Sequence, residues 1–174
     1  MAKLVVGTNS KNAVPSSVVY KDRPGSIPRI VDEDGDVIQP NKPIDLSGVK
    51  GVGVRAYWYA MYGNERLYGD GVINSDDVVQ VYGTNAFREC FDKCINVNRV
   101  LFNNLESASG NSCFESAFAE TSIKMQVFPK LKRVYVSAST AFYKAYSNCS
   151  QLKMIAFPSL EASDSKSFNQ IISN

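Results

Sequence analysis

Histidine is missing from all 174 residues of the chain. Because histidine is the commonest general base of enzymes and a frequent metal ligand, its absence excludes the usual serine triads and cysteine–histidine pairs. A zinc site is also disfavoured, although Cys90 and Cys94 have a tolerable ligand spacing, because no histidine accompanies them. We therefore expect a protein that is not an enzyme and that needs neither a cofactor nor a metal.

Long apolar runs and a strong charge of one sign are also lacking. No stretch approaches the roughly 18 apolar residues of a membrane span, and the first residues lack the apolar core of a secretory signal. The 19 lysines and arginines against 17 acids give a net charge of only +2, with one small basic cluster at Lys130, Lys132 and Arg133. We expect neither a membrane nor a nucleic acid as the partner.

A degenerate repeat fills the second half of the chain. A small residue followed by phenylalanine recurs, and these phenylalanines lie at positions 87, 114, 142 and 168, which are 27, 28 and 26 residues apart. After the first three of them, a second aromatic follows four residues later: Phe91, Phe118 and Tyr146. Repeats of this length are typical of solenoids, whose copies stack to bury a shared core.

Each copy has a recognisable order of local structure. Two rings four residues apart share one face of a short helical turn. The triplets 100–102 and 155–157 alternate like a strand, and in the copies with Phe128 and Phe157 the proline of a Phe-Pro-x-Leu motif ends the strand. We expect a mainly β solenoid with short helical turns, whose repeat core is formed by Phe87, Phe91, Phe102, Leu105, Phe114, Phe118, Phe128, Leu131, Phe142, Tyr146, Phe157 and Leu160.

The two best copies read AFRECFDKCINVNRVLFNNL, residues 86–105, and AFYKAYSNCSQLKMIAFPSL, residues 141–160. They resemble the BspA-type leucine-rich repeat. The resemblance covers residues 84–174, as three copies and a partial fourth, and implies a role in surface adhesion and recognition. The middle copy departs from the pattern, with Glu120 in place of the cysteine and Gln126 in place of the strand aliphatic.

The four cysteines fall where the repeat requires a small buried residue. They are Cys90, Cys94, Cys113 and Cys149. We expect reduced core thiols rather than a disulfide framework.

Residues 1–50 differ in composition from the repeat. They hold most of the seven prolines, and short apolar runs such as 18–20, 30–31 and 37–38 alternate with breakers. Asp34-Gly35 reads as a hairpin turn, and the surrounding acids lack the glycine and glutamate positions of a calcium loop. We interpret this segment as an extended anchoring arm that docks on a partner surface.

Residues 51–83 predict a small β unit that covers the N-terminal end of the solenoid. Val52, Val54, Ala56 and Trp58 alternate as one face of a strand, so the Gly-x-Gly at its start is no dinucleotide motif. The densest aromatic cluster follows, and packing or stacking on a sugar could each explain it. Its members are Tyr57, Trp58, Tyr59 and Tyr62.

Paired acids offer the remaining route to catalysis. Asp76 and Asp77 follow Asn74-Ser75, where a turn or helix cap is the simpler explanation, and Glu161 with Asp164 reads as a solvated pair. A fourth copy opens at Phe168 without a polar cap after it, so we expect another subunit, another protein or further residues of the chain to cover that end.

Together these features favour a non-enzymatic structural or attachment protein of a phage virion, such as a fibre, decoration or host-recognition component. We expect it to reside in the virion, to contact other virion proteins through residues 1–50, and to form a homo-oligomer, for which a trimer would suit a fibre. A host-surface receptor or glycan is the expected ligand. The alternatives are a bacterial cell-surface adhesin fragment, a carbohydrate-binding module and, more weakly, a hydrolase with paired acids.

Overall fold

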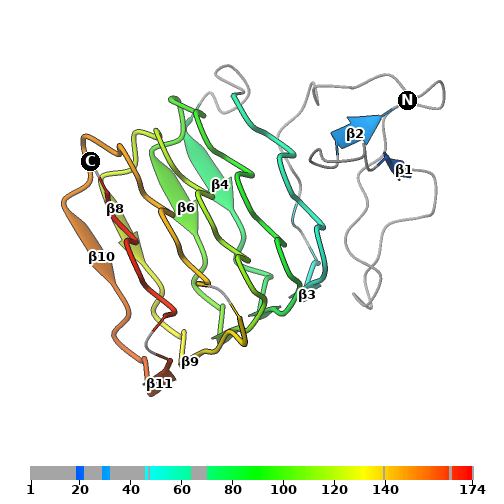
Figure 1. The fold of residues 1–174 in the computed structure, drawn as a ribbon. Coiled ribbons are helices and arrows are strands. Elements are labelled where there is room, and N and C mark those ends of the chain that lie inside the picture. Colours follow the sequence, from blue (N-terminus) through cyan, green and yellow to red (C-terminus); the bar gives the residue numbers. More distant parts are fainter. Residues whose placement is uncertain are drawn as a thin grey trace.

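The computed structural model describes residues 19–21, 29–31, 46, 48–63, 70–138, 140–164 and 166–173. From residue 46 onward they form a β-solenoid of about four turns (Figure 1). Near the N-terminus, β1 (Val19–Lys21) and β2 (Arg29–Val31) pair antiparallel, and they overlap two of the predicted apolar runs. The predicted turn at Asp34-Gly35 lies outside the described residues.

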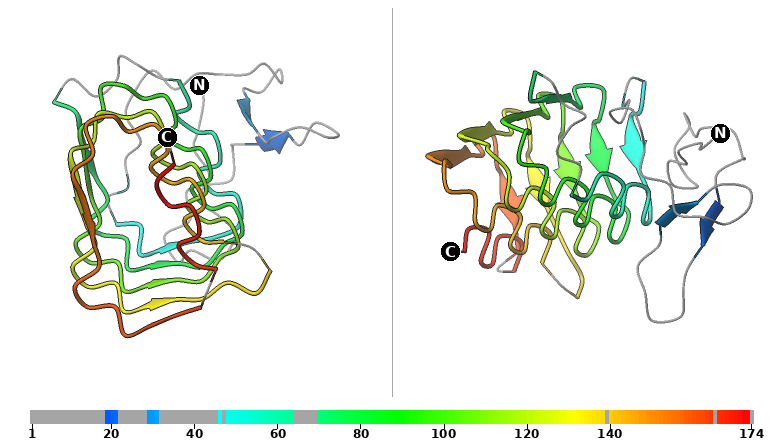
Figure 2. Two further views of the ribbon diagram at one scale, coloured as in Figure 1. Left: turned by 60° about the vertical axis from the view of Figure 1, so that its left-hand side comes forward. Right: turned by 90° about the horizontal axis from the view of Figure 1, so that it is seen from above.

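Two sides of each coil are short parallel strands. One side is a five-stranded sheet, in the order β11-β9-β7-β5-β3, made of β3 (Gly51–Val52), β5 (Gln80–Val81), β7 (Ser107–Ala108), β9 (Arg133–Val134) and β11 (Ala162–Ser163). The other side, here called the four-strand wall, contains β4 (Val72–Asn74), β6 (Arg99–Leu101), β8 (Met125–Val127) and β10 (Met154–Ala156). The left view of Figure 2 looks along the stacked coils.

The third side, here called the turn wall, comprises residues 55–63, 84–94, 111–121, 140–149 and 166–171. Its backbone alternates between two kinds of hydrogen bond. The Phe87 N–H donates to the Cys113 carbonyl of the next coil at 2.7 Å, whereas the Arg88 N–H closes a tight turn onto Asn85 at 3.3 Å. Every second residue of the turn wall thus donates a backbone hydrogen bond to the neighbouring coil.

The short helical turns predicted for these segments are not confirmed, because no helix occurs among the described residues. Every fourth residue instead has a left-handed φ: 57° at Asn85, 51° at Glu89 and 61° at Lys93. A right-handed helix cannot contain such residues. Phe87 and Phe91 nevertheless both lie fully buried, as the four-residue spacing predicted.

Stacked aromatic rings run the length of the interior. Phe87, Phe114 and Phe142 lie in one column as predicted, with ring centroids 5.4 and 4.8 Å apart. Tyr57 and Phe168 extend this column at its two ends, at 5.1 and 5.4 Å from their neighbours. Two parallel columns accompany it, namely Phe91–Phe118–Tyr146 and Phe102–Phe128–Phe157.

The predicted repeat-core side chains are buried, apart from Phe157 and Leu160 of the last coil, which are partly buried. The columns also contact one another edge-on, as where Phe102 meets Phe114 at 5.5 Å and 87°. The core is therefore one continuous apolar interior shared by successive coils.

Residues 51–83 add a coil at the N-terminal end of the solenoid. β3 pairs with β5 and β4 pairs with β6, and both pairs are parallel. The long alternating strand expected here is wrong, since β3 ends at Val52, Val54 is 59% exposed and Tyr57 is fully buried. The chain enters the turn wall just after β3, which places Tyr57 inside and Val54 outside, whereas Val52, Ala56 and Trp58 of the expected face are buried.

The cysteine position of the middle copy is held by Thr121, not by Glu120, which corrects the sequence register. The Thr121 hydroxyl lies 3.4 Å from the Cys149 sulfur and donates to the Phe118 carbonyl. Cys149 donates to that same carbonyl at 3.0 Å, and Cys94 donates to Met61 O at 2.9 Å. All four cysteines are buried thiols, and burial raises the pKa of Cys113 to about 12.

Glycines stack where the five-stranded sheet meets the turn wall. A Cβ on Gly83 would lie 1.8 Å from the carbonyl carbon of Gly53, and a Cβ on Gly110 would lie 2.0 Å from the Gly83 oxygen. Only glycine allows the backbones of successive coils to approach so closely.

Gly83→Ala is expected to destabilise the full chain by about 3 kcal/mol, because backbone atoms of the neighbouring coil must move to admit the methyl group. Urea unfolding measures this. Gly51→Ala is the matched control, since its Cβ would meet only side chains, the nearest at 3.1 Å. Equal unfolding midpoints for the two variants would contradict the close stacking of these coils.

Candidate binding site on the turn wall

The predicted aromatic cluster divides between the core and the outer surface of the turn wall. Tyr57 is fully buried and stacks on Phe87, so it belongs to the core. Trp58 is 8% exposed, and Tyr59 and Tyr62 are half-buried. Any ligand of this surface would therefore contact Tyr59 and Tyr62 rather than Tyr57.

Two arginines cover Trp58. The guanidinium carbons of Arg55 and Arg88 lie 5.1 and 5.5 Å from the centre of its ring, within the range of cation–π attraction. Arg88 comes from the next coil, and it also pairs with Glu89 at 3.1 Å and with Glu115 at 3.0 Å. Because the two guanidinium groups already cover the Trp58 ring, this ring is poorly placed to stack on a sugar.

Tyr59 and Tyr62 form a stacked pair, with ring centroids 4.7 Å apart and planes 14° from parallel. Burial, followed by a hydrogen bond with Glu89, raises the pKa of Tyr59. The Lys93 ammonium lies 5.4 Å from the centre of the Tyr62 ring, and its hydrogen bond with the Tyr62 hydroxyl raises the pKa of Lys93. Charged residues of the second coil thus surround the tyrosines of the first.

Acidic residues complete this surface. Burial raises the pKa of Asp92 to about 6, with further contributions from the nearby charges of Glu120 and Glu89. Its Oδ1 atom is buried without a hydrogen-bond partner. We call the surface the aromatic–charged patch, comprising Arg55, Trp58, Tyr59, Tyr62, Arg88, Glu89, Asp92, Lys93, Glu115 and Glu120.

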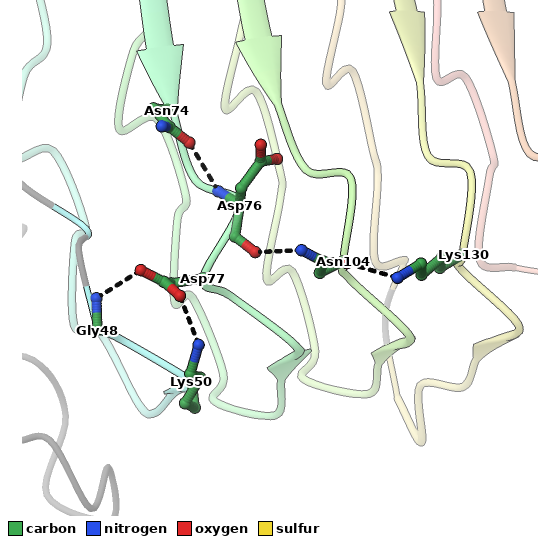
Figure 3. A network of polar contacts seen from close by, with 7 residues as sticks. All are labelled: Gly48, Lys50, Asn74, Asp76, Asp77, Asn104 and Lys130. Carbon is green, nitrogen blue, oxygen red and sulfur yellow. Dashed lines mark hydrogen bonds and ion pairs between the residues drawn. The ribbon is translucent and has the colours of Figure 1, made fainter.

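The predicted acid pair at Asp76 and Asp77 lies elsewhere, at the corner between the two strand walls (Figure 3). The Asp76 carboxylate accepts hydrogen bonds from the Asn103 backbone N–H at 3.0 Å and from the Asn103 side-chain amide at 3.2 Å. Asp77 accepts the Gly48 N–H at 2.8 Å and pairs with Lys50. The two carboxylates therefore join their coil to its two neighbours, in opposite directions.

This polar corner continues along the solenoid. The Asn104 amide donates to the Asp76 carbonyl at 2.9 Å, and the Lys130 ammonium donates to Asn104 Oδ1 at 2.6 Å (Figure 3). The hydrogen bond from Gly48, followed by Lys50, lowers the pKa of Asp77. In the second predicted pair, Asp164 likewise links two coils, because its carboxylate accepts the Val136 N–H at 2.7 Å. These contacts give the acids a role in coil stacking.

Among the residues that the structure describes, no cluster of three or more histidine, cysteine or acidic side chains could hold a metal ion. The described part of the chain also contains no helix that is long and apolar enough to cross a membrane.

Comparison of the chain with protein-family models, with curated proteins and with solved structures found no match.

Asp92→Asn is expected to stabilise the full chain by about 1 kcal/mol at pH 7 and to have little effect at pH 4. The folded-state pKa of about 6 lies above the ordinary value of about 3.9, so ionisation of Asp92 costs stability as the pH rises from 4 to 6. Partial exposure reduces the full linkage value.

Urea unfolding of the wild type and the variant at both pH values measures the difference. Glu106→Gln, an exposed change on the five-stranded sheet, is the control. An equal effect of Asp92→Asn on the free energy of unfolding at pH 4 and pH 7 would contradict the raised folded-state pKa of Asp92.

Proposed function

We propose that the protein is a non-enzymatic structural and attachment protein, in which a stiff solenoid presents the aromatic–charged patch to a binding partner. The observation that carries the proposal is the continuous aromatic column from Tyr57 to Phe168. The stacked rings fill the interior of every coil, so the outer walls remain as the surfaces for function.

The acids weighed as catalytic candidates support the same conclusion. Asp76 and Asp77 bond to Asn103, Gly48 and Lys50 of neighbouring coils. A catalytic acid pair would need its carboxylates directed toward a shared substrate position. Here they satisfy separate backbone and side-chain donors.

A phage virion is the setting that we propose, with residues 1–50 as the segment that docks on other virion proteins. We interpret the coil as a divergent relative of the BspA-type repeat, whose members serve mainly in adhesion and recognition. The bacterial surface adhesin stays the alternative. Both settings need a protein that presents a large, rigid surface, and solenoid stacking supplies one.

Carbohydrate binding is the second candidate, and the stacked pair of Tyr59 and Tyr62 favours it. Their half-buried rings lie beside Lys93 and Glu89, which could donate to and accept from sugar hydroxyls. On a glycan array, binding that Tyr59→Ala abolishes and Tyr135→Ala retains would support this candidate. Tyr135 is an exposed tyrosine on the five-stranded side.

Attachment through the patch predicts that Tyr62→Ala combined with Lys93→Ala weakens binding of the labelled full chain to receptor-bearing cells at least about tenfold, the loss of a contact worth 1.4 kcal/mol or more. The matched control combines Tyr135→Ala with Lys132→Ala, the same two residue types exposed on the five-stranded side. Flow cytometry measures the binding. Equal losses in the two double variants would place attachment elsewhere.

The virion setting predicts that purified phage particles from the producing culture contain the intact chain, with a copy number that stays constant through gradient purification. Quantitative mass spectrometry of the particles measures this. Recovery of the chain in the bacterial envelope and not in the particles would instead support the adhesin alternative.

A further inference from the structure

The outward face of the four-strand wall carries exposed apolar side chains. Gln126 and Ile155 point inward in register with each other, so their neighbours on each strand point outward. Met125 is 55% exposed and Met154 is 45% exposed, and they lie side by side on β8 and β10. Leu101, Val127 and Ala156 are half-exposed on the same face.

The charges beside β6, β8 and β10 of this wall are all positive, whereas Asp70 precedes β4. Stretches 95–101, 122–128 and 151–157 contain Arg99, Lys124 and Lys153 but no acid. The strand register places Lys124 next to Lys153, and like charges on adjacent strands repel. None of the ion pairs found among the described residues involves these three side chains.

The other two walls mix both signs of charge. The five-stranded sheet has Glu106 and Glu161 beside Lys132, and on the turn wall Arg88 pairs with Glu115. The part of the four-strand wall formed by β6, β8 and β10 therefore differs in chemistry from the other two walls. It suits an acidic partner that also carries apolar side chains.

The chain itself contains such a segment. Residues 30–38 read Ile-Val-Asp-Glu-Asp-Gly-Asp-Val-Ile, in which acids are flanked on both sides by a pair of apolar residues. Face-to-face contact of two walls is disfavoured, because it would oppose Arg99, Lys124 and Lys153 to the same cations. The acidic segment offers complementary charge, and its apolar pairs match the exposed methionines.

We propose that the four-strand wall is an interaction surface for a second copy of the chain, and that it binds residues 30–38 of that copy. The acids Asp32, Glu33 and Asp34 face the three cations of the wall, and the flanking apolar pairs cover Met125 and Met154. The wall cations Lys124 and Lys153 lie in later coils, away from residue 46, where the chain enters the solenoid. Exchange of the segment in both directions closes a symmetric dimer.

Charge reversal in the full chain tests this proposal. The wall variant combines Arg99→Glu, Lys124→Glu and Lys153→Glu, and the segment variant combines Asp32→Lys, Glu33→Lys and Asp34→Lys. Each variant alone is expected to dissociate at least tenfold more readily than the wild type in analytical ultracentrifugation. An equimolar mixture of the two is expected to associate again, because each then offers the charge that the other lacks.

The control variant combines Lys132→Glu with Arg133→Glu on the five-stranded sheet, and it is expected to associate like the wild type. Thermal unfolding establishes that each variant is folded. Should the triple wall variant fail to fold, Lys124→Gln with Lys153→Gln provides a milder change with the same expected direction.

Three results would each overturn the proposal: a wild type that is monomeric at all accessible concentrations, reversed variants that associate like the wild type, or a mixture that stays dissociated. Crosslinks between the segment and the wall within a single chain would assign the wall to the chain's own segment. Binding of anionic vesicles by a monomeric wild type would assign it to lipid. Either of these last results contradicts a second copy as the occupant. The dimer test does not involve the aromatic–charged patch, so its outcome is independent of the attachment experiment.

Discussion

Stacking of identical positions in successive coils is the constraint on which the rest of the structure depends. Ring centroids in the central column are separated by 4.8 to 5.4 Å, close to the distance between hydrogen-bonded strands. Aromatic stacking and backbone pairing therefore require the same coil spacing, and each supports the other. The column at Gly53, Gly83 and Gly110 follows from this spacing, because a side chain there would force the coils apart.

The column of Phe87, Phe114 and Phe142 could be predicted because repeat spacing fixes which residues stack, whatever local structure lies between them. The local structure could not be inferred as safely. Two aromatics four residues apart fit a helical turn and a run of tight turns equally well, and the difference lies in φ. Glu89 and Lys93 have left-handed φ values without the glycine or asparagine that signals them. Hydrogen bonds to adjacent coils, which a single segment does not reveal, stabilise that backbone.

The candidate site, too, could be predicted from the sequence only in part. The sequence indicated the cluster of Trp58, Tyr59 and Tyr62, but not that Arg88 and Lys93 would cover it. These partners lie one coil away, about thirty residues along the chain. These contacts were not predicted because the sequence pattern did not reveal the first coil as a repeat copy. That copy begins at Ala56, and Met61 stands where the other copies have their second aromatic. An alignment that included this copy would have placed Trp58 beside Arg88, and Tyr62 beside Asp92 and Lys93.

Gln126 shows how the solenoid tolerates a departure from its repeat. The four-strand wall divides between β6 and β8, and Gln126 lies at that break, almost fully buried in a position held elsewhere by Ile73, Val100 and Ile155. Its amide donates to the Val100 carbonyl at 3.1 Å, so a side chain provides a link between coils where the strand ladder is interrupted. The amide oxygen remains without a partner, which costs stability. The aromatic columns and the five-stranded sheet continue past this point, so they maintain the register of the coils where the four-strand wall is interrupted.

The interrupted four-strand wall is also the one with an unbalanced positive surface. Binding of an acidic segment across β8 and β10 would add contacts to the side of the solenoid that has the weakest connection between coils.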